Sequence, residues 1–153
     1  MEMYQEFKRF FGNRSVTSGL FLYIHESKLE VELVAFYPRN WFVGDKSPEI
    51  LIFTKSDIVR VVKDYKALEV EVYKDFKVTK LAYFERLNDR NVGSKLELTL
   101  KTGDRIILDP TNDNNEDLIG YCNNYIKEIF NTLKWNTSSA SIVGKQSGGE
   151  VNV

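Results

Sequence analysis

Hydrophobic residues at the start of the chain recur with the period of a helix. Met3, Phe7 and Phe11 lie on one side of a helix over residues 2–11, with charged residues between them. Gly12 follows at the place where a helix commonly ends. We therefore predict a short amphipathic helix over residues 2–11, with its phenylalanine side packed on the segments that follow.

The pattern then changes to alternation at every second residue, which is typical of strands with one buried face. Residues 20–25 form the first strand-like run, and residues 26–28 supply a polar turn. Residues 29–37 alternate next, beginning with Leu29 and Val31 on the apolar face. We predict that these two runs pair as a hairpin.

Further strand-like runs continue to residue 109, joined by short polar turns. Alternation breaks near Leu81, so the run that contains it is expected to be bent or bulged. The whole region predicts about eight short strands in an antiparallel meander, folded as a small barrel or sandwich. The later runs are residues 49–54, 58–63, 68–73, 76–86, 95–101 and 105–108.

A helical pattern returns over residues 113–134. Asp113 is a good N-cap, and Glu116, three residues later, completes a capping box. A helix this apolar on one side must lie against a sheet or close the end of a barrel. Its apolar stripe consists of Leu118, Cys122, Tyr125 and Ile129.

These elements predict an α+β fold with a short N-terminal helix, an antiparallel meander and a long amphipathic C-terminal helix. We expect a single domain over residues 1–137, because the 153-residue chain has no internal repeat and no interior linker. Residues 138–153 carry few large apolar groups and cannot offset the entropy lost on ordering. We predict that they form a flexible tail.

Two stretches of the chain resemble the pleckstrin-homology-like superfold, and its bacterial and GRAM-like branches in particular. Residues 50–62 contain an apolar strand, Thr54, a polar turn and a second apolar strand. Residues 95–108, followed by the helix of residues 113–134, are similar to the last hairpin and closing helix of those domains. The resemblance spans about residues 20–134 and leaves the N-terminal helix as an addition. It implies a domain that binds lipids, peptides or proteins and is not an enzyme.

The first hairpin loop argues against one of these ligands. Lipid-binding members of the superfold gather basic residues in that loop. Residues 26–28 contain a single lysine beside a glutamate. We therefore do not expect this chain to bind phosphoinositides.

Composition and charge narrow the partners further. The formal net charge is -1, and the two signs are interspersed along the chain. A general nucleic-acid binder needs a clustered basic surface, so we expect no nucleic acid among the partners. The longest apolar runs are far shorter than the roughly 20 residues that span a bilayer. A single cysteine fits a reducing compartment, and we expect a cytoplasmic protein.

Few residues suit catalysis or metal binding. His25 and Cys122 are the sole histidine and cysteine, and Cys122 falls on the apolar stripe of the C-terminal helix. A structural zinc site needs about four such ligands, so it is excluded. Residues 109–120 lack the glycine and the final glutamate of a calcium loop. We expect no catalytic residue, no metal and no cofactor.

Two pairs of glutamates occur at alternate positions. Glu30 and Glu32 form one pair, and Glu69 and Glu71 form the other. This spacing puts both members of a pair on the polar face of a strand. We expect them to pair with lysine or arginine on neighbouring strands, since acid–base catalysis would also need a cleft.

The loop of residues 38–48 is the best candidate for a binding site. It places Trp41 beside Phe42, with Arg39 and Lys46 on either side. Exposing either ring forgoes about 1.5–3 kcal/mol of burial, and tryptophan is enriched at binding hot spots. We favour the alternative that the loop folds back and covers one end of the barrel. The four residues are retained as the candidate site for a partner.

These observations predict a non-enzymatic binding or scaffolding domain that acts through contacts with a protein or peptide. One alternative is a carrier that holds a small apolar ligand inside an aromatic-lined barrel. A less favoured alternative is an enzyme that uses carboxylates or tyrosines in a cleft. The sequence leaves homodimerisation open.

Overall fold

The structure is a computed structural model that describes residues 2–86 and 93–134. Its elements run in the order of three helices, seven strands and a final group of helices within these residues. The helices are α1 (Glu2–Phe11), α2 (Ser15–Glu26), α3 (Leu29–Glu32), α4 (Pro110–Asp113), the 3₁₀ turn η1 (Glu116–Leu118) and α5 (Ile119–Lys134). The strands are β1 (Ala35–Arg39), β2 (Glu49–Phe53), β3 (Ile58–Lys63), β4 (Leu68–Tyr73), β5 (Val78–Glu85), β6 (Ser94–Leu100) and β7 (Arg105–Leu108).

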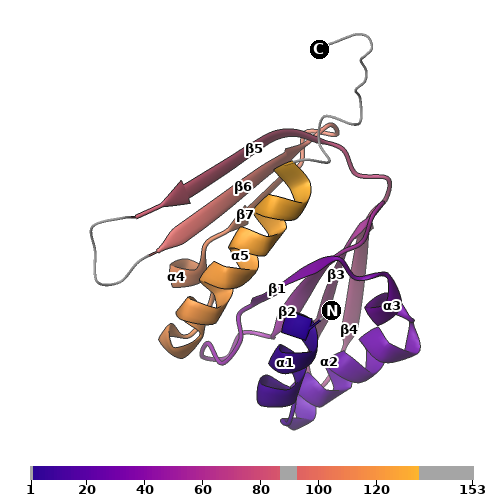
Figure 1. The fold of residues 1–153 in the computed structure, drawn as a ribbon. Helices are drawn as coiled ribbons and strands as arrows, with labels where there is room; N and C mark the ends of the chain where they lie inside the picture. The colour runs from indigo at the N-terminus through magenta and orange to yellow at the C-terminus, as the bar shows by residue number, and fades with distance from the viewer. Residues whose placement is uncertain (1, 87–92, 135–153) are drawn as a thin grey trace, which may run out of the picture.

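The described strands form two antiparallel sheets (Figure 1). Sheet A has the order β1-β2-β3-β4, and sheet B has the order β5-β6-β7. Every neighbouring pair is consecutive in the chain, so each sheet is a simple meander. The predicted α+β class and antiparallel meander are confirmed, but the described strands form two separate sheets and not a closed barrel.

The prediction of a strand over residues 20–25 is wrong. This segment belongs to α2, where Thr17, Leu20, Phe21 and Ile24 are buried. Their spacing of three, four and seven residues places them on one face of a helix. A short apolar run such as residues 20–24 fits a strand and a helix equally well. The helical spacing becomes visible only when Thr17 is counted with the buried residues, and a threonine is not an apolar residue in the sequence pattern.

The predicted hairpin partner over residues 29–37 is also wrong in its first half. Leu29–Glu32 is the short helix α3, entered through Lys28 at a positive φ of 65°. Val31, expected on the apolar face, is 83% exposed. The strand starts only at Ala35, where β1 pairs with β2 instead of with residues 20–25.

The C-terminal helix begins later than predicted. Pro110–Asp113 is the separate helix α4, and α5 starts at Ile119 after the turn η1. Asp113 is buried at the end of α4, where it serves as an acceptor for other segments and not as the cap of α5. The Asn115 side chain accepts a hydrogen bond from the Asp117 backbone at the start of η1 instead.

The remaining elements agree with the sequence pattern. β4 and β7 have the predicted bounds, and the register of β5 shifts between Val78 and Lys80, close to the predicted irregularity. The quoted stretches 50–62 and 95–108 form the hairpins β2–β3 and β6–β7. The predicted tail 138–153 and the last residues of the predicted domain lie outside the described residues.

Helices cover one face of each sheet (Figure 1), and their aromatic side chains pack in a common core. The ring of Phe36 on β1 contacts Tyr4 and Phe7 of α1, with centroids 5.4 and 5.5 Å apart. It also contacts Tyr125 of α5 at 4.4 Å. Farther along α5, Phe130 stacks on Tyr83 of β5 at 5.0 Å. The helix α5 therefore bridges the two sheets and fixes their relative position.

Candidate functional site

Trp41 lies in the core and not on the surface. Its exposed fraction is 0%, and its ring contacts Phe7 at 5.1 Å and Phe21 at 5.9 Å. The indole nitrogen donates to the carbonyl of Phe11 at 3.3 Å, and the Trp41 amide donates to Asn114 at 3.0 Å. The loop thus folds back over the end of α1, as the covering interpretation expects.

The other three residues of the predicted site point in different directions. Phe42, at a positive φ of 58°, is 37% exposed and lies under the Arg14 guanidinium at 4.7 Å. Lys46 is exposed at the far end of the loop. Arg39 extends across sheet A and is partly buried. The four residues do not form one surface, and their role in binding a partner stays a prediction.

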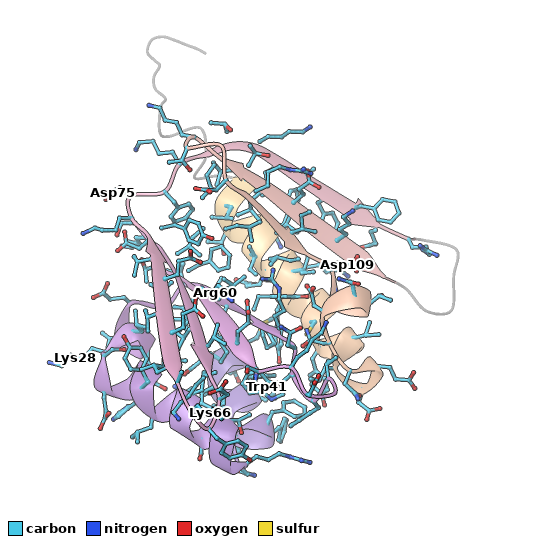
Figure 2. The ribbon with its side chains drawn as sticks, turned by 180° about the vertical axis from the view of Figure 1, so that it is seen from behind. Lys28, Trp41, Arg60, Lys66, Asp75 and Asp109 are labelled. Atoms are coloured by element: carbon cyan, nitrogen blue, oxygen red, sulfur yellow. The ribbon has the colours of Figure 1, made fainter. Side chains whose placement is uncertain are left out.

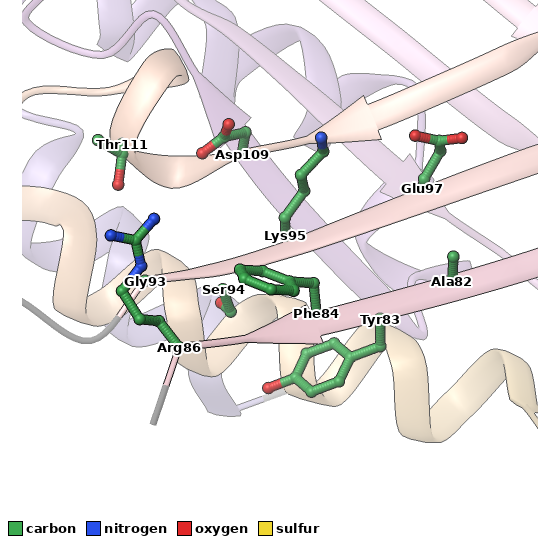
Figure 3. A pocket seen from close by; sticks show the side chains of 10 residues that line it. All are labelled: Ala82, Tyr83, Phe84, Arg86, Gly93, Ser94, Lys95, Glu97, Asp109 and Thr111. Atoms are coloured by element: carbon green, nitrogen blue, oxygen red, sulfur yellow. The ribbon is translucent and has the colours of Figure 1, made fainter. Parts of the chain in front are cut away.

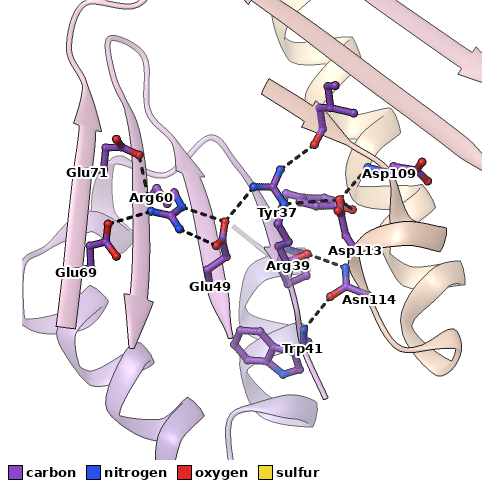
Figure 4. Close-up of polar contacts among 12 residues, drawn as sticks. Tyr37, Arg39, Trp41, Glu49, Arg60, Glu69, Glu71, Asp109, Asp113 and Asn114 are labelled. Carbon is purple, nitrogen blue, oxygen red and sulfur yellow. Dashed lines mark hydrogen bonds and ion pairs between the residues drawn. The ribbon is translucent and has the colours of Figure 1, made fainter. Parts of the chain in front are cut away.

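A chain of ion pairs crosses sheet A beside this loop (Figure 4). Glu49 on β2, with its side chain 4% exposed, stands between Arg39 of β1 and Arg60 of β3. Its carboxylate is 3.0 Å from Arg39 and accepts from Arg60 at 3.1 and 3.2 Å. Burial alone would lower the pKa of Arg60, but Glu49, then Glu69 and Glu71, raise it. The two arginines therefore neutralise a buried carboxylate and tie three strands together.

The same network reaches the second sheet. Arg39 donates to the carbonyl of Ile107 on β7 at 2.8 Å and lies 3.7 Å from Asp113. Asp113 in turn accepts from the Tyr37 hydroxyl at 2.8 Å. Burial, followed by the Asp113 charge, raises the pKa of Tyr37, so this hydroxyl stays a donor. Arg39 and Tyr37 thereby connect sheet A to β7 and α4.

A groove of about 350 Å³ opens along these residues. It runs between the face of sheet A opposite α1 and α2 and the strand β7, and Figure 2 shows Arg60 between the two sheets. Its walls are ion-paired arginines and acids with a few apolar side chains. The lining residues are Arg39, Leu51, Arg60, Glu71, Tyr73, Arg105, Ile106 and Ile107.

The groove ends at β4, which is the free edge of sheet A. Of the four strands that end a sheet in the described structure, three carry features that blunt an edge. β1 contains Pro38 and is buried, β5 has a register shift beside Lys80, and β7 spans only Arg105–Leu108. β4 has six residues, alternating apolar and acidic, with no proline, lysine or bulge.

The apolar side of β4 is not covered by the helices. Val59 and Val61 on β3 are 5% and 0% exposed, because α2 packs on them. Their cross-strand partners on β4 are Val72 and Val70, on the same face of the sheet. These are 47% and 38% exposed, and Leu68 is 44% exposed. The helix layer therefore covers β3 and leaves an apolar strip of Leu68, Val70 and Val72 on β4.

The opposite side of β4 is acidic. Glu69 and Glu71 lie 3.4 and 3.8 Å from Arg60, and their side chains are 66% and 51% exposed. Cross-strand pairing of these glutamates with an arginine was predicted and is confirmed. Glu30, by contrast, sits on α3 and pairs with Lys8 and His25 at 2.9 and 2.8 Å.

A larger hollow lies on the outer face of sheet B (Figure 3). Its volume is about 730 Å³, and its lining mixes both charges. Lys95 and Glu97 of β6 face it together with the exposed ring of Phe84 on β5. Arg86 and Gly93, the described residues on either side of the undescribed range 87–92, also line it.

The thiol of Cys122 and the hydroxyl of Tyr83 are held in their neutral forms. Burial, and then the Asp113 charge, raises the pKa of the Cys122 thiol to about 12. Burial and a bond to Glu85 raise the pKa of Tyr83 to about 12. Neither group has the lowered pKa of an activated nucleophile.

Two kinds of feature are absent from residues 2–86 and 93–134. Within these ranges, histidine, cysteine and acidic side chains do not gather in a cluster of three or more that could ligate a metal. The helices of the same ranges are too short or too polar to cross a membrane.

The edge of β4 was missed by the sequence analysis although the strand itself was predicted. The run Leu68–Tyr73 shows that one face is apolar and one acidic. It does not show that the helices leave the apolar face open, because that depends on how far α2 extends over the sheet. The sequence feature that could have identified an open edge is the absence of lysine and proline from Leu68–Tyr73, the last strand of its sheet.

Comparisons with other proteins give one match. No curated protein and no solved structure matches the chain. The resemblance to the pleckstrin-homology-like superfold stays a prediction. Residues 22–124, which are more than half of the chain and extend from α2 into α5, match a family profile. The chain belongs to the family described as Protein of unknown function (DUF3908).

Proposed function

We propose that this protein is a non-enzymatic binding domain that holds another protein at the free edge of β4. One observation carries the proposal: a regular six-residue edge strand, without proline, lysine or bulge, has an apolar strip that the helix layer leaves uncovered. Such an edge presents unpaired backbone donors and acceptors in a row. Strand addition uses this row for affinity and the alternate side chains for specificity.

The shape of the molecule supports this choice over an interior ligand site. A carrier would need a hollow lined by aromatic rings. In the described core these rings pack on one another, as Phe7 does on Phe11, Phe36 and Trp41. No observation favours the carrier, so it is not proposed further.

The neutral core groups support a role without catalysis. Cys122 and Tyr37 are both buried and have raised pKa values. The carboxylates Glu49 and Asp113 are engaged by arginine or by tyrosine. A domain of this kind is expected to act in the cytoplasm, and we expect its partner to be a protein and not a nucleic acid.

Affinity capture from the cells that naturally make the protein tests the proposal. The bait is compared with Val72→Lys, which places a charge on the apolar strip of β4. Phe84→Lys is the matched control, because Phe84 is a strand residue of sheet B outside the groove and is 56% exposed, against 47% for Val72. We expect a protein that the wild type and Phe84→Lys retain and that Val72→Lys loses. Equal retention by all three baits would overturn the proposal.

A further inference from the structure

The two faces of β4 differ in a way that restricts what can be added beside it. Leu68, Val70 and Val72 point to the helix side, and Glu69 and Glu71 point to the groove side. An added strand would lie about 4.8 Å from β4 and would continue both faces. Its side chains would therefore meet apolar groups on one face and carboxylates on the other.

The groove side has more negative than positive charge near the edge. Arg39 and Arg60 face four carboxylates in the described ion pairs, which are Glu49, Glu69, Glu71 and Asp113. Arg105 also lines the groove, but it pairs with Glu97 of sheet B at 2.6 Å. Arg60 makes its shortest contacts with Glu49, so it neutralises Glu69 and Glu71 only in part. The outermost pair of carboxylates is thus able to accept further cations.

A second copy of the same chain is a poor match for this edge. Two copies of β4 related by a twofold axis pair in antiparallel fashion, and the residue on the axis faces itself. An axis at Val70 places Glu69 opposite the partner's Glu71. An axis at Glu69 or Glu71 places that glutamate opposite itself. Like charges in directly opposed positions are destabilising, so the strand disfavours its own copy in all three central registers.

We infer that β4 binds an extended segment of another protein in which basic residues alternate with apolar ones. The inference rests on the proposed function and specifies the chemistry of the partner. The apolar side chains of the segment extend the strip of Leu68, Val70 and Val72. Its lysine or arginine side chains lie opposite Glu69 and Glu71, at the roughly 5 Å spacing of directly paired residues. Lys66 and Lys74 flank the strand and would repel basic residues at the two ends of the segment. The basic residues of the segment are therefore expected only opposite Glu69 and Glu71.

Labelled peptides of about seven residues, the length of a typical strand, test this chemistry. The probe alternates valine with lysine, and its counterpart alternates valine with glutamate. A third peptide has the composition of the probe but separates the valines from the lysines in two blocks. Fluorescence anisotropy measures the affinity of each for the wild type and for the double variant Glu69→Lys, Glu71→Lys. Both glutamates are exposed, and circular dichroism verifies that the variant is folded.

We expect the valine–lysine probe to bind the wild type roughly tenfold more tightly than the valine–glutamate peptide, from two cross-strand charge pairs. The double variant should reverse this order, and added salt should reduce the difference. Weak binding by the two-block peptide would support strand pairing over simple charge attraction. Equal affinities for the lysine and glutamate peptides would overturn the inference. Capture of a partner that Val72→Lys abolishes would still support the proposed function in that case.

Sedimentation tests separately whether a second copy of the chain occupies the edge of β4. A wild-type dimer that Val72→Lys converts to a monomer would show that a second copy occupies the edge, and it would overturn the inference about a basic partner. We expect a monomer at concentrations where the peptides bind.

Discussion

Trp41 is the largest fully buried side chain among the described residues, and it closes the core at the end of α1. Its ring lies among Phe7, Phe21 and Phe42, and its indole nitrogen reaches the last turn of α1. The neighbouring Phe42 is 37% exposed and lies between the Phe11 ring and the Arg14 guanidinium. Two adjacent aromatic residues in one loop therefore have different roles, which their sequence alone does not separate.

Replacing Trp41 with alanine should lower the free energy of unfolding by about 3–5 kcal/mol, since a large buried ring is lost and a cavity remains. Urea unfolding followed by circular dichroism measures the change. Phe42→Ala is the control and should lose about 1 kcal/mol or less, mainly the contact with Arg14. Equal losses for the two variants would contradict the covering role of Trp41.

The thiol of Cys122 should be inert in the folded protein. Burial raises its pKa to about 12, so the reactive thiolate is scarce at neutral pH. Because the folded pKa is raised, this group favours the folded state fully below the ordinary thiol pKa and loses that effect as the pH rises towards about 12. A chromogenic disulfide reagent should react slowly with the native protein and readily in denaturant. Rapid reaction in the native state would show that the stripe of α5 is open.

At the scale of elements, α2 is the clearest case of a pattern with two interpretations. The apolar run of residues 20–24 satisfies alternation, and Thr17 breaks the apolar periodicity that would have identified a helix. Tertiary packing decides the outcome, because α2 supplies the layer that covers β3. The strands β3, β4 and β7, with polar turns on both sides, offered no such ambiguity and were predicted with the observed bounds.

Two alanine substitutions distinguish the helix from the predicted strand. Phe21 is 3% exposed and Leu22 is 55% exposed, whereas alternation would have buried Leu22 with Leu20 and Ile24. We expect Phe21→Ala to cost about 3–5 kcal/mol of stability and Leu22→Ala to cost less than about 1 kcal/mol. The free energies come from urea unfolding. A large loss in Leu22→Ala would restore the strand prediction.

The ion pairs around Glu49 give a prediction for sheet A. Glu49→Gln removes the negative charge between Arg39 and Arg60. The two partly buried guanidinium groups then lose their shared carboxylate partner. We expect a loss of about 3 kcal/mol. Glu69→Gln, in which the altered side chain is largely exposed, should change stability by about 1 kcal/mol or less. Thermal and urea unfolding compare the two variants, and similar losses would show that the network does not depend on its buried member.

At the scale of the whole molecule, α5 and the Arg39 contacts join two small sheets into one body, and this arrangement decides which surfaces stay open. The α+β class, six of the expected strands with the end of a seventh, and the apolar stripe of α5 could be predicted from periodicity. The division into two sheets could not, because the same run of hairpins closes into a barrel or splits according to packing between distant strands. The open edge follows from that packing, since Val59 and Val61 of β3 are buried whereas their partners Val72 and Val70 on β4 stay exposed.

Amide hydrogen exchange of β4 tests the central claim most directly. The protein is measured alone and with saturating valine–lysine peptide, and the residues compared are Leu68–Tyr73 on β4 and Ala35–Arg39 on β1, at the other edge of the same sheet. The account predicts that the peptide slows exchange in β4 and leaves β1 unchanged, because an added strand pairs with the free backbone groups of β4. Unchanged exchange in β4, or protection centred on another element, would contradict it.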